Sequence, residues 1–258
     1  MIRDASRADL PLIRDLFARA NDMPYDLAAV AEEKCFGEGF AGATRVRLYE
    51  DAGIAVTCRG ALRVLAVDRA HRRRGIGSAL LADSEANIIG AEAGNYFVAG
   101  VEPMMVNWLT KRGYREKSRT NNLTTGRLDY PIAPEIQRGD ERALAFIEHH
   151  FGAIWSFECA RALRNDPPTL FVIEEAGRII AFSAHEANNR GLGTFGPVGV
   201  AMDHRGRGLG RLLLQASLAD LRRLGYERAI IPWTGAIDFY EKSCGARVEL
   251  QLVIMVRD

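Results

Sequence analysis

The chain has 258 residues, of which 48% are hydrophobic and 26% are charged, the balance of a folded globular protein. Its 34 Lys and Arg residues nearly cancel its 33 Asp and Glu residues, so a surface that binds nucleic acid through general positive charge is not expected. No run approaches the roughly 20 apolar residues of a membrane-spanning helix, and the charged start MIRDASRADL has no signal-peptide core, so we expect a cytoplasmic protein that does not bind membranes.

The sequence of the first half predicts helices and strands in a regular order. A serine-capped amphipathic helix is expected in SRADLPLIRDLFARA, followed by a meander of three strands. A glycine-rich turn then leads into a second amphipathic helix. NYFVAG at 95–100 predicts the next strand, and a helix ends at KRGY, 111–114. The three strands of the meander are expected at 44–51, 53–58 and 61–68.

A segment with two prolines, TGRLDYPIAPEIQRGDE at 125–141, ends in the helix-start signal Gly139-Asp140-Glu141. We place a domain boundary near residue 128, which gives domains of residues 1–128 and 129–258. The second half then predicts the same order of elements as the first. Its helices are expected at 140–151, 151–163 and 237–248, and its strands at 169–175, 178–186, 196–202 and 226–233.

The two halves also match residue by residue around their glycine turns. VLAVDRAHRRRGIGSALL at 64–81 aligns with PVGVAMDHRGRGLGRLLL at 197–214. In that alignment His71 meets His204 and Gly75 meets Gly208. A shared motif in a shared order of elements predicts one α/β fold used twice. Each copy is expected to be a mixed, mostly antiparallel sheet flanked by helices.

The repeated turn reads Arg-x-x-Gly-x-Gly and lies between a strand and a helix. The first N–H groups of a helix lack intrahelical partners, and glycines let an anion approach them closely. Arginines add forked donors that suit phosphate. The phosphate-binding GxxxxGK[ST] pattern is absent, and Leu80 and Leu213 replace the third glycine of the dinucleotide pattern GxGxxG. The turn therefore predicts a site for a diphosphate or a similar anion, but not one that belongs to either of these two patterns.

RxxGxG after a strand resembles the acyl-CoA signature of the GNAT superfamily of N-acyltransferases. FYEKSCG at 239–245 is similar to a second element of that superfamily, FYEKxG. The resemblance covers both halves and implies a tandem GNAT protein. It implies that the strand before each turn parts from the next strand, that pantetheine lies in the opening, and that each turn holds the CoA diphosphate. The implied cofactor-binding residues are Val67, Arg72, Arg73, Arg74, Gly75, Ile76, Gly77, Val200, Arg205, Gly206, Arg207, Gly208, Leu209 and Gly210.

The resemblance also implies catalytic roles, chiefly in the second half. The backbone N–H of Val200 would stabilise the oxyanion, and the Tyr240 hydroxyl would donate to the departing thiolate. The first half has Trp108 or Leu109 at the position of Tyr240, neither with a hydroxyl. We therefore expect a catalytic second half and a degenerate or supporting first half.

A base or an ordered water must take the proton of the amine. His185 and Glu186 end the predicted strand RIIAFSAHE and are the candidates for that base, although a lone histidine at a strand end is more often a hydrogen-bonded surface residue. For the acceptor amine, Trp155, Glu158 and Trp233 are the candidate binding residues, with buried tryptophans and a surface acid as the alternative.

The leading hypothesis is an acetyl-CoA-dependent N-acetyltransferase acting on a small amine, an amino acid or a peptide. One alternative is an acyl-CoA-binding or interaction protein without catalysis. Another is a mycothiol-synthase-like tandem acetyltransferase. No metal is expected, because no histidine or cysteine lies at metal-ligand spacing from a partner. Nucleic acid is not an expected partner, and the chain is expected to be a monomer or a homodimer.

Overall fold

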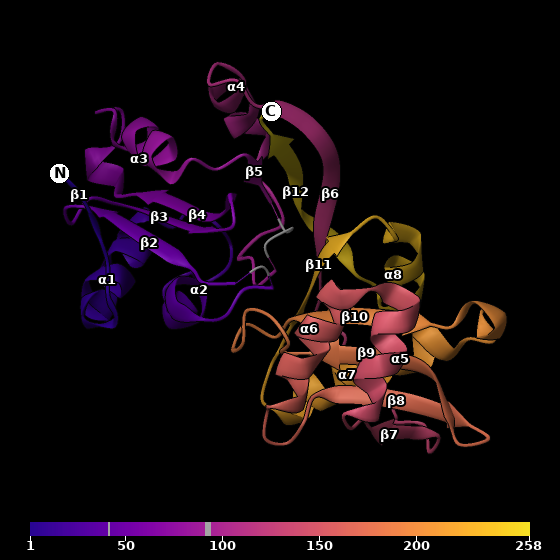
Figure 1. Ribbon diagram of the computed structural model, residues 1–258. Coiled ribbons are helices and arrows are strands. Elements are labelled where there is room, and N and C mark those ends of the chain that lie inside the picture. The colour runs from indigo at the N-terminus through magenta and orange to yellow at the C-terminus, as the bar shows by residue number, and fades with distance from the viewer. Residues whose placement is uncertain (41, 91–93) are drawn as a thin grey trace. The chain divides into compact units, whose positions relative to one another are not determined.

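The computed structural model describes residues 1–40, 42–90 and 94–258 (Figure 1). By packing, the chain divides into two compact units. Unit 1 comprises Met1–Thr120 and Gln251–Asp258, and unit 2 comprises Asn121–Leu250. The division falls inside strand β6 (Arg115–Thr125) and strand β12 (Arg247–Val256), so each unit contains a part of both strands. The boundary near residue 128 stays a prediction about domains that fold independently.

Unit 1 is built on a sheet of strand order β1-β2-β3-β4-β5-β12. Neighbouring strands are antiparallel except β4 and β5, which are parallel. The meander β2-β3-β4 forms because short turns join runs of buried apolar residues, and β3 is buried along its whole length. The bounds are Ile2–Asp4 for β1, Arg45–Tyr49 for β2, Gly53–Cys58 for β3, Ala61–Val67 for β4 and Ile88–Ile89 for β5.

Helices cover both faces of this sheet. Helices α1 and α2 lie on one face and α3 lies on the other (Figure 1). The predicted serine cap is confirmed, because Ser6 and Asp9 form a capping box just before α1. The bounds are Leu10–Ala20 for α1, Ala31–Phe36 for α2, Ile76–Ser84 for α3 and Pro103–Thr110 for α4.

The prediction of a strand at 95–100 is wrong. These residues form bends, and the parallel partner of β4 is β5, which lies before them in the chain. The apolar run of NYFVAG is buried without strand pairing: Tyr96, Phe97 and Ala99 are each at most 4% exposed. An apolar run shows that a segment is buried, but pairing depends on which strand edge is available.

Unit 2 has the same order of elements as unit 1. Its main sheet has the strand order β10-β9-β8-β7, all antiparallel, and β6 pairs with β11. Strand β7 lies inside the segment 125–141, in which the sequence predicts the domain boundary. The bounds are Ile136–Arg138 for β7, Leu170–Glu175 for β8, Arg178–His185 for β9, Phe195–Val200 for β10 and Ala229–Thr234 for β11.

Helices α5 and α6 pack on one face of the main sheet and α7 on the other. The face under α5 and α6 carries an aromatic cluster in which the rings of Phe151 and Trp155 stack with centroids 5.5 Å apart. The bounds are Arg142–Phe151 for α5, Ala153–Leu163 for α6, Leu209–Arg223 for α7 and Ile237–Cys244 for α8. The repeated order of elements confirms the predicted mixed α/β fold used twice.

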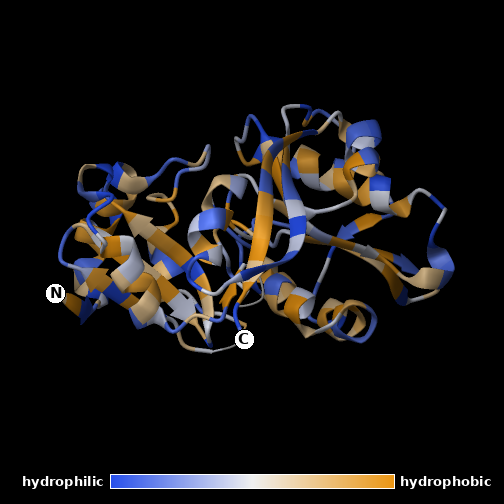
Figure 2. Ribbon diagram, turned by 90° about the horizontal axis from the view of Figure 1, so that it is seen from above, coloured by the Kyte–Doolittle hydropathy of each residue, from blue (hydrophilic) through white to orange (hydrophobic). Residues whose placement is uncertain are grey.

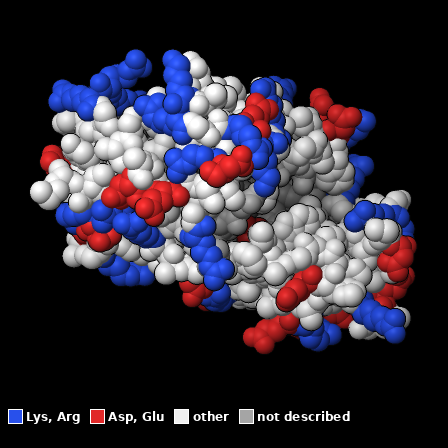
Figure 3. Space-filling model, turned by 45° about the horizontal axis from the view of Figure 1, so that its top comes forward, with Lys and Arg blue, Asp and Glu red and all other residues white. Residues whose placement is uncertain are grey.

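Hydrophobic residues are concentrated in the strands, and hydrophilic residues in the loops and on the outer sides of the helices (Figure 2). On the face drawn in Figure 3, acidic side chains lie among the basic ones, as the near-zero net charge suggests. In the described part of the chain, no helix is long and apolar enough to cross a bilayer. The same residues contain no group of three or more His, Cys, Asp or Glu side chains arranged for a metal ion.

Candidate functional site

The two glycine turns have the same backbone conformation. Gly75 and Gly208 precede helices α3 and α7 with φ angles of +85° and +81°. Two positions earlier, Arg73 and Gly206 also have positive φ, +64° and +79°. These left-handed conformations strain a residue that carries a Cβ, so they explain Gly75 and Gly208 by geometry alone.

The second glycine of each motif needs another explanation. Gly77 and Gly210 lie inside the first turn of their helices and have no positive φ. A Cβ on Gly77 would lie 3.6 Å from Val67 Cγ2, and a Cβ on Gly210 would lie 3.7 Å from Val200 Cγ2, which are ordinary contacts. Packing within the protein therefore tolerates a side chain at both positions. A bare backbone beside unpaired helix N–H groups fits the close approach of an anion.

The strand before each turn parts from its parallel neighbour, as expected. In unit 1, β4 pairs with β5 only at Ala61 and Leu62. In unit 2, the described residues of β10 have no ladder with β11. The one described backbone bridge joins Thr194, directly before β10, to Ile230 of β11. In both units the strand then runs on to its turn without a ladder on that side. Backbone groups on this edge are therefore available to a ligand.

The ladder pattern shows which way the backbone of Val200 points. Ala201 donates to Ile180 O at 2.9 Å, so Ala201 and Ile180 form a hydrogen-bonded pair. Hydrogen-bonded and non-bonded pairs alternate along an antiparallel ladder, and Val200 pairs with Ala181. The N–H of Val200 therefore points away from β9, toward the side where β10 has no ladder partner.

Val67 has the same orientation in unit 1. Asp68 donates to Ala52 O at 2.9 Å, and Val67 is the neighbouring member of the ladder, opposite Gly53. The N–H of Val67 therefore points away from β3. Both units thus direct one valine N–H toward the opening between the parted strands, the position that the resemblance implies for the thioester carbonyl.

The first arginine of each motif braces its turn. Arg72 donates from Nε to Val67 O at 3.1 Å, and Arg205 donates from Nε to Val200 O at 3.2 Å. Arg72 also donates to Ala20 O at 2.7 Å and pairs with Asp22. These contacts fix the turn against the preceding strand and confirm that the valine carbonyls face outward. Both arginines therefore have a structural task whether or not a ligand is bound.

The remaining arginines differ between the units. Arg73 and Arg74 are exposed at the start of α3. In unit 2, Arg207 makes two hydrogen bonds to Glu175 of the β8–β9 hairpin, at 2.9 and 3.1 Å. His204 lies 3.3 Å from the same carboxylate. Sequence reasoning missed Glu175, because residues 32 positions apart give no local signal of their pairing.

Tyr240 lies on α8 with only 7% of its surface exposed. Its ring meets Phe195 edge to face, with centroids 6.2 Å apart. Burial raises the pKa of its hydroxyl, and the nearby Cys244 thiol raises it further. Within the described residues, no hydrogen-bond partner occupies this hydroxyl. The group is therefore protonated at neutral pH and able to donate.

The packing against the glycines identifies the counterpart of Tyr240 in unit 1. A Cβ on Gly77 would lie 3.9 Å from Trp108, and a Cβ on Gly210 would lie 3.9 Å from Phe239. Trp108 therefore corresponds to Phe239, and the next residue, Leu109, corresponds to Tyr240. Leu109 is buried and has no hydroxyl.

His185 is fully buried between β9 and α7. Its Nε2 lies 3.0 Å from Asp220 Oδ2, and Arg138 from β7 donates to both oxygens of Asp220. Burial raises the pKa of Asp220, but the hydrogen bonds from His185 and Arg138 lower it by more in total, so the net pKa is below its usual value. The three side chains connect a strand at the sheet edge, an inner strand and a helix.

Glu186 is 5% exposed and its carboxylate organises the loop between β9 and β10. Oε1 accepts a hydrogen bond from Thr194 N at 2.9 Å, and Oε2 accepts one from Tyr226 Oη at 2.6 Å. Gly191 N also donates to Oε2. These bonds fix the loop next to Thr194, which forms the backbone bridge to Ile230 of β11. Its role as a base stays a prediction, as does that of His185.

The candidate acceptor residues do not form a cluster in the described contacts. Trp155 packs into the aromatic cluster of α5 and α6, and Glu158 is 7% exposed on the same helix α6. The backbone N–H of Trp233 donates to Asn122 Oδ1 at 3.1 Å, and its φ is +50°. Binding of the acceptor by Trp155, Glu158 and Trp233 stays a prediction.

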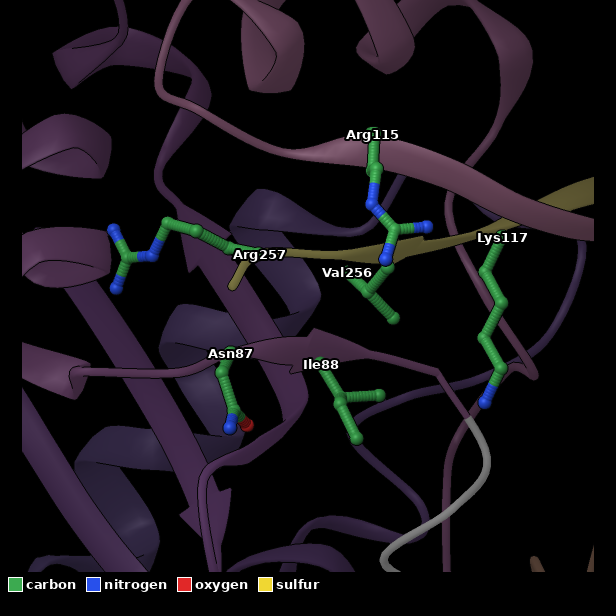
Figure 4. A pocket seen from close by; sticks show the side chains of 6 residues that line it. All are labelled: Asn87, Ile88, Arg115, Lys117, Val256 and Arg257. Carbon is green, nitrogen blue, oxygen red and sulfur yellow. The ribbon is translucent and has the colours of Figure 1, made fainter.

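An open hollow of about 310 Å3 lies elsewhere, in unit 1. Figure 4 shows Ile88 and Val256 in this hollow below Arg115 and Lys117 of β6, with Asn87 and Arg257 beside them. Ile88 pairs with the beginning of β4, whereas the glycine turn follows the end of β4. The hollow is therefore distinct from the predicted acyl-CoA position, and no predicted site residue lines it.

Comparison with known proteins gives a family match over both halves. The model of the acetyltransferase (GNAT) family matches residues 4–102 and 134–246. A mycothiol acetyltransferase from Thermobispora bispora is 32% identical over 113 residues. That alignment covers 38% of this chain and 38% of the relative, so most of the relative lies outside it.

Two solved structures share the fold. One is a GCN5-related glucosamine N-acetyltransferase region of a fungal multi-domain GH3 β-N-acetylglucosaminidase, with a TM-score of 0.78 and 17% identity. It covers 99% of this chain and 38% of that protein. The other is a tandem GNAT protein from the clavulanic acid biosynthesis pathway, with a TM-score of 0.69 and 15% identity over 99% of this chain and 97% of that one.

Proposed function

The chain belongs to the GNAT family of acetyltransferases, and we propose that it transfers the acetyl group of acetyl-CoA to a small amine, an amino acid or a peptide. The observation that supports this proposal most is the arrangement of unit 2. The Val200 N–H points toward the unpaired edge of β10, directly before a glycine turn whose helix N-terminus is open to an anion.

Each part of unit 2 has a role in this proposal. The backbone from Arg205 to Gly210 holds the diphosphate of acetyl-CoA. The amine forms a C–N bond with the thioester carbonyl carbon, and the C–S bond breaks as CoA leaves. Val200 N–H donates to the carbonyl oxygen as it gains charge, a type of contact whose removal costs about 100- to 1000-fold in rate. Tyr240 donates its hydroxyl proton to the departing sulfur.

The amine must also lose a proton to a base. His185 is bonded to Asp220 inside the packed layer under α7, and both oxygens of Glu186 accept hydrogen bonds from the protein. We propose that both side chains position their elements and that an ordered water takes the proton of the amine. A base acting from Glu186 would need to break these contacts, and His185 is fully buried with its Nε2 held by Asp220.

The relatives support a small amine as the acceptor. One is named a mycothiol acetyltransferase and another a glucosamine N-acetyltransferase region. A mycothiol-synthase-like transferase is therefore the narrower form of the proposal. The second candidate function is acyl-CoA binding without catalysis. It is favoured by unit 1, which has the turn and the oriented Val67 N–H but no hydroxyl at Leu109.

A turnover assay separates these functions. The purified full chain is mixed with acetyl-CoA and, in turn, glucosamine, free amino acids and a peptide with a free N-terminus. Release of free CoA thiol is followed together with the mass of the acetylated amine. Amine-dependent thiol release with a matching mass gain supports the transferase. Binding of acetyl-CoA without any acetylated product supports the non-catalytic function.

A further inference from the structure

Two side chains at the glycine turn of unit 2, Arg207 and His204, contact a carboxylate of the same unit. Glu175 ends β8 and accepts two parallel hydrogen bonds from Arg207, at 2.9 and 3.1 Å. Its Oε2 lies 3.3 Å from Nε2 of His204. Arg207 is part of the glycine motif, and His204 ends the short helix just before it. Glu175 thus contacts Arg207 inside the motif and His204 just before it, whose Nδ1 also lies 2.7 Å from Asp203 Oδ1.

Among its described residues, unit 1 has no carboxylate that contacts both counterparts of Arg207 and His204; His71, which aligns with His204, lies 3.5 Å from Asp68 Oδ2. Arg74 aligns with Arg207, and among the described residues it makes no ion pair. The hairpin of unit 1 carries Glu50, but this carboxylate accepts from the N-terminal ammonium of Met1 at 2.7 Å. The backbone of the turn is the same in both units, so the carboxylate clamp is a difference in side chains alone.

We propose that Glu175 sets the affinity of unit 2 for the diphosphate part of acyl-CoA, by competing with that diphosphate for Arg207 and His204. This inference rests on the proposed binding of acyl-CoA at the turn. A diphosphate and a carboxylate are attracted by the same guanidinium, and each repels the other. Acyl-CoA must therefore displace Glu175 from Arg207, so unit 2 binds acyl-CoA more weakly than it would without Glu175.

The size of this effect follows from exposure. The side chains of Arg207 and Glu175 are 47% and 49% exposed, so water and salt screen their attraction. Exposed ion pairs contribute little to free energy, and removing this one should tighten binding by about two- to fivefold. The clamp concerns only phosphate, so a thioester donor without phosphates should not respond.

The test compares Glu175→Gln with Glu174→Gln in the full chain. Gly77→Glu is added to both, because it obstructs the turn of unit 1. Glu174 is the neighbouring residue and pairs with Arg142 at 2.8 Å, away from the turn, which makes it a matched control. The Kd for CoA and the KM and kcat for acetyl-CoA are measured at low salt, together with kcat/KM for acetyl-pantetheine.

We expect Glu175→Gln to lower the Kd for CoA and the KM for acetyl-CoA by two- to fivefold, with kcat and the use of acetyl-pantetheine unchanged. Adding Arg207→Gln should abolish that gain. An unchanged or higher Kd, or an equal gain with acetyl-pantetheine or with Glu174→Gln, overturns the role of Glu175. If neither variant nor their common parent binds CoA, the proposed binding at this turn is itself rejected.

Discussion

The glycine turns of the two units have one backbone and two different surroundings. Both have left-handed residues at matched positions, an arginine bonded to the preceding valine carbonyl, and a valine N–H directed away from the ladder. Around this shared frame, unit 2 has Tyr240 and unit 1 has Leu109. Backbone features suited to binding a thioester are therefore repeated, while the proposed proton donor is present in unit 2 and replaced in unit 1.

This difference separates binding from catalysis. A strand that parts from its neighbour and a helix that starts at glycines require only backbone geometry, which both halves keep. The proposed proton donation requires a hydroxyl at one position of α8, that of Tyr240. Substitutions at matched positions should therefore have unequal effects on acetyl transfer, even where their effects on stability are alike.

The largest difference in kcat is expected between the substitutions of two tyrosines, Tyr240 in unit 2 and Tyr114 in unit 1. Tyr240→Phe removes the proposed donor in unit 2, and we expect kcat to fall by about 100-fold with KM for acetyl-CoA little changed. Tyr114→Phe is the control in unit 1, where the hydroxyl donates to Ala86 O inside the core. It should lower stability and leave kcat unchanged. Steady-state kinetics checks both, and wild-type turnover by Tyr240→Phe would remove the assigned role.

A smaller difference, in the free energy of unfolding, is expected between two acids that each pair with an arginine. Asp220→Asn weakens the buried contacts with His185 and Arg138, and we expect a loss of about 2 kcal/mol in the free energy of unfolding. Asp83→Asn in unit 1 weakens the Arg47–Asp83 pair, whose side chains are 14% and 23% exposed. That loss should be about 1 kcal/mol or less. Urea unfolding of the two variants measures the difference.

The contacts of Asp220 with His185 and Arg138 also predict how the stability of the fold depends on pH. The pKa of Asp220 is lower in the folded chain than in the unfolded one, so its carboxylate stabilises the fold above the unfolded pKa of about 4. This contribution is lost as the pH falls toward the folded pKa. Stability measured from pH 6 down to pH 3 should therefore fall less steeply in Asp220→Asn than in the wild type. Parallel curves would show that the pKa of Asp220 is the same in the folded and the unfolded chain.

The smallest effects are expected at the helix starts. Ser6→Ala removes the capping box before α1, and Asp140→Ala removes the acceptor of the Arg142 N–H at the start of α5. Each should cost about 1 kcal/mol of stability with acetyl transfer unchanged. Thermal unfolding measures both. A change in kcat for Asp140→Ala alone would mean that the first helices of unit 2 take part in the reaction.

Much of this architecture follows from local sequence signals. The two halves, the serine cap and both glycine turns could be predicted, because glycine, capping residues and alternating apolar residues act on their own neighbourhood. The strand expected at 95–100 could not be placed correctly, since a buried apolar run pairs only where a strand edge is free. Strand β5 has two residues and therefore almost no periodic signal.

The polar residues were harder to interpret. His185 and Glu186 share a strand end, but one side chain reaches Asp220 on α7 and the other holds a loop and Tyr226. Those partners lie 35 and 40 residues away in the sequence, so no local pattern predicts the pairing. The clamp of Glu175 on Arg207 was missed for the same reason. The sequence shows which side chains could act as acids, bases or ligands. Only the folded structure shows which of them are hydrogen-bonded to other side chains of the protein.

The central claim is that unit 2 transfers the acetyl group and unit 1 does not. Gly77→Glu and Gly210→Glu test it directly, because each places a carboxylate at the start of one helix, where a diphosphate would lie. Acetyl-CoA turnover and calorimetric stoichiometry are measured for both variants and for the wild type. We expect Gly210→Glu to lower turnover by more than about 100-fold, equivalent to about 2.7 kcal/mol, and Gly77→Glu to leave it nearly unchanged. Full activity of Gly210→Glu, or its loss in Gly77→Glu alone, would contradict the account.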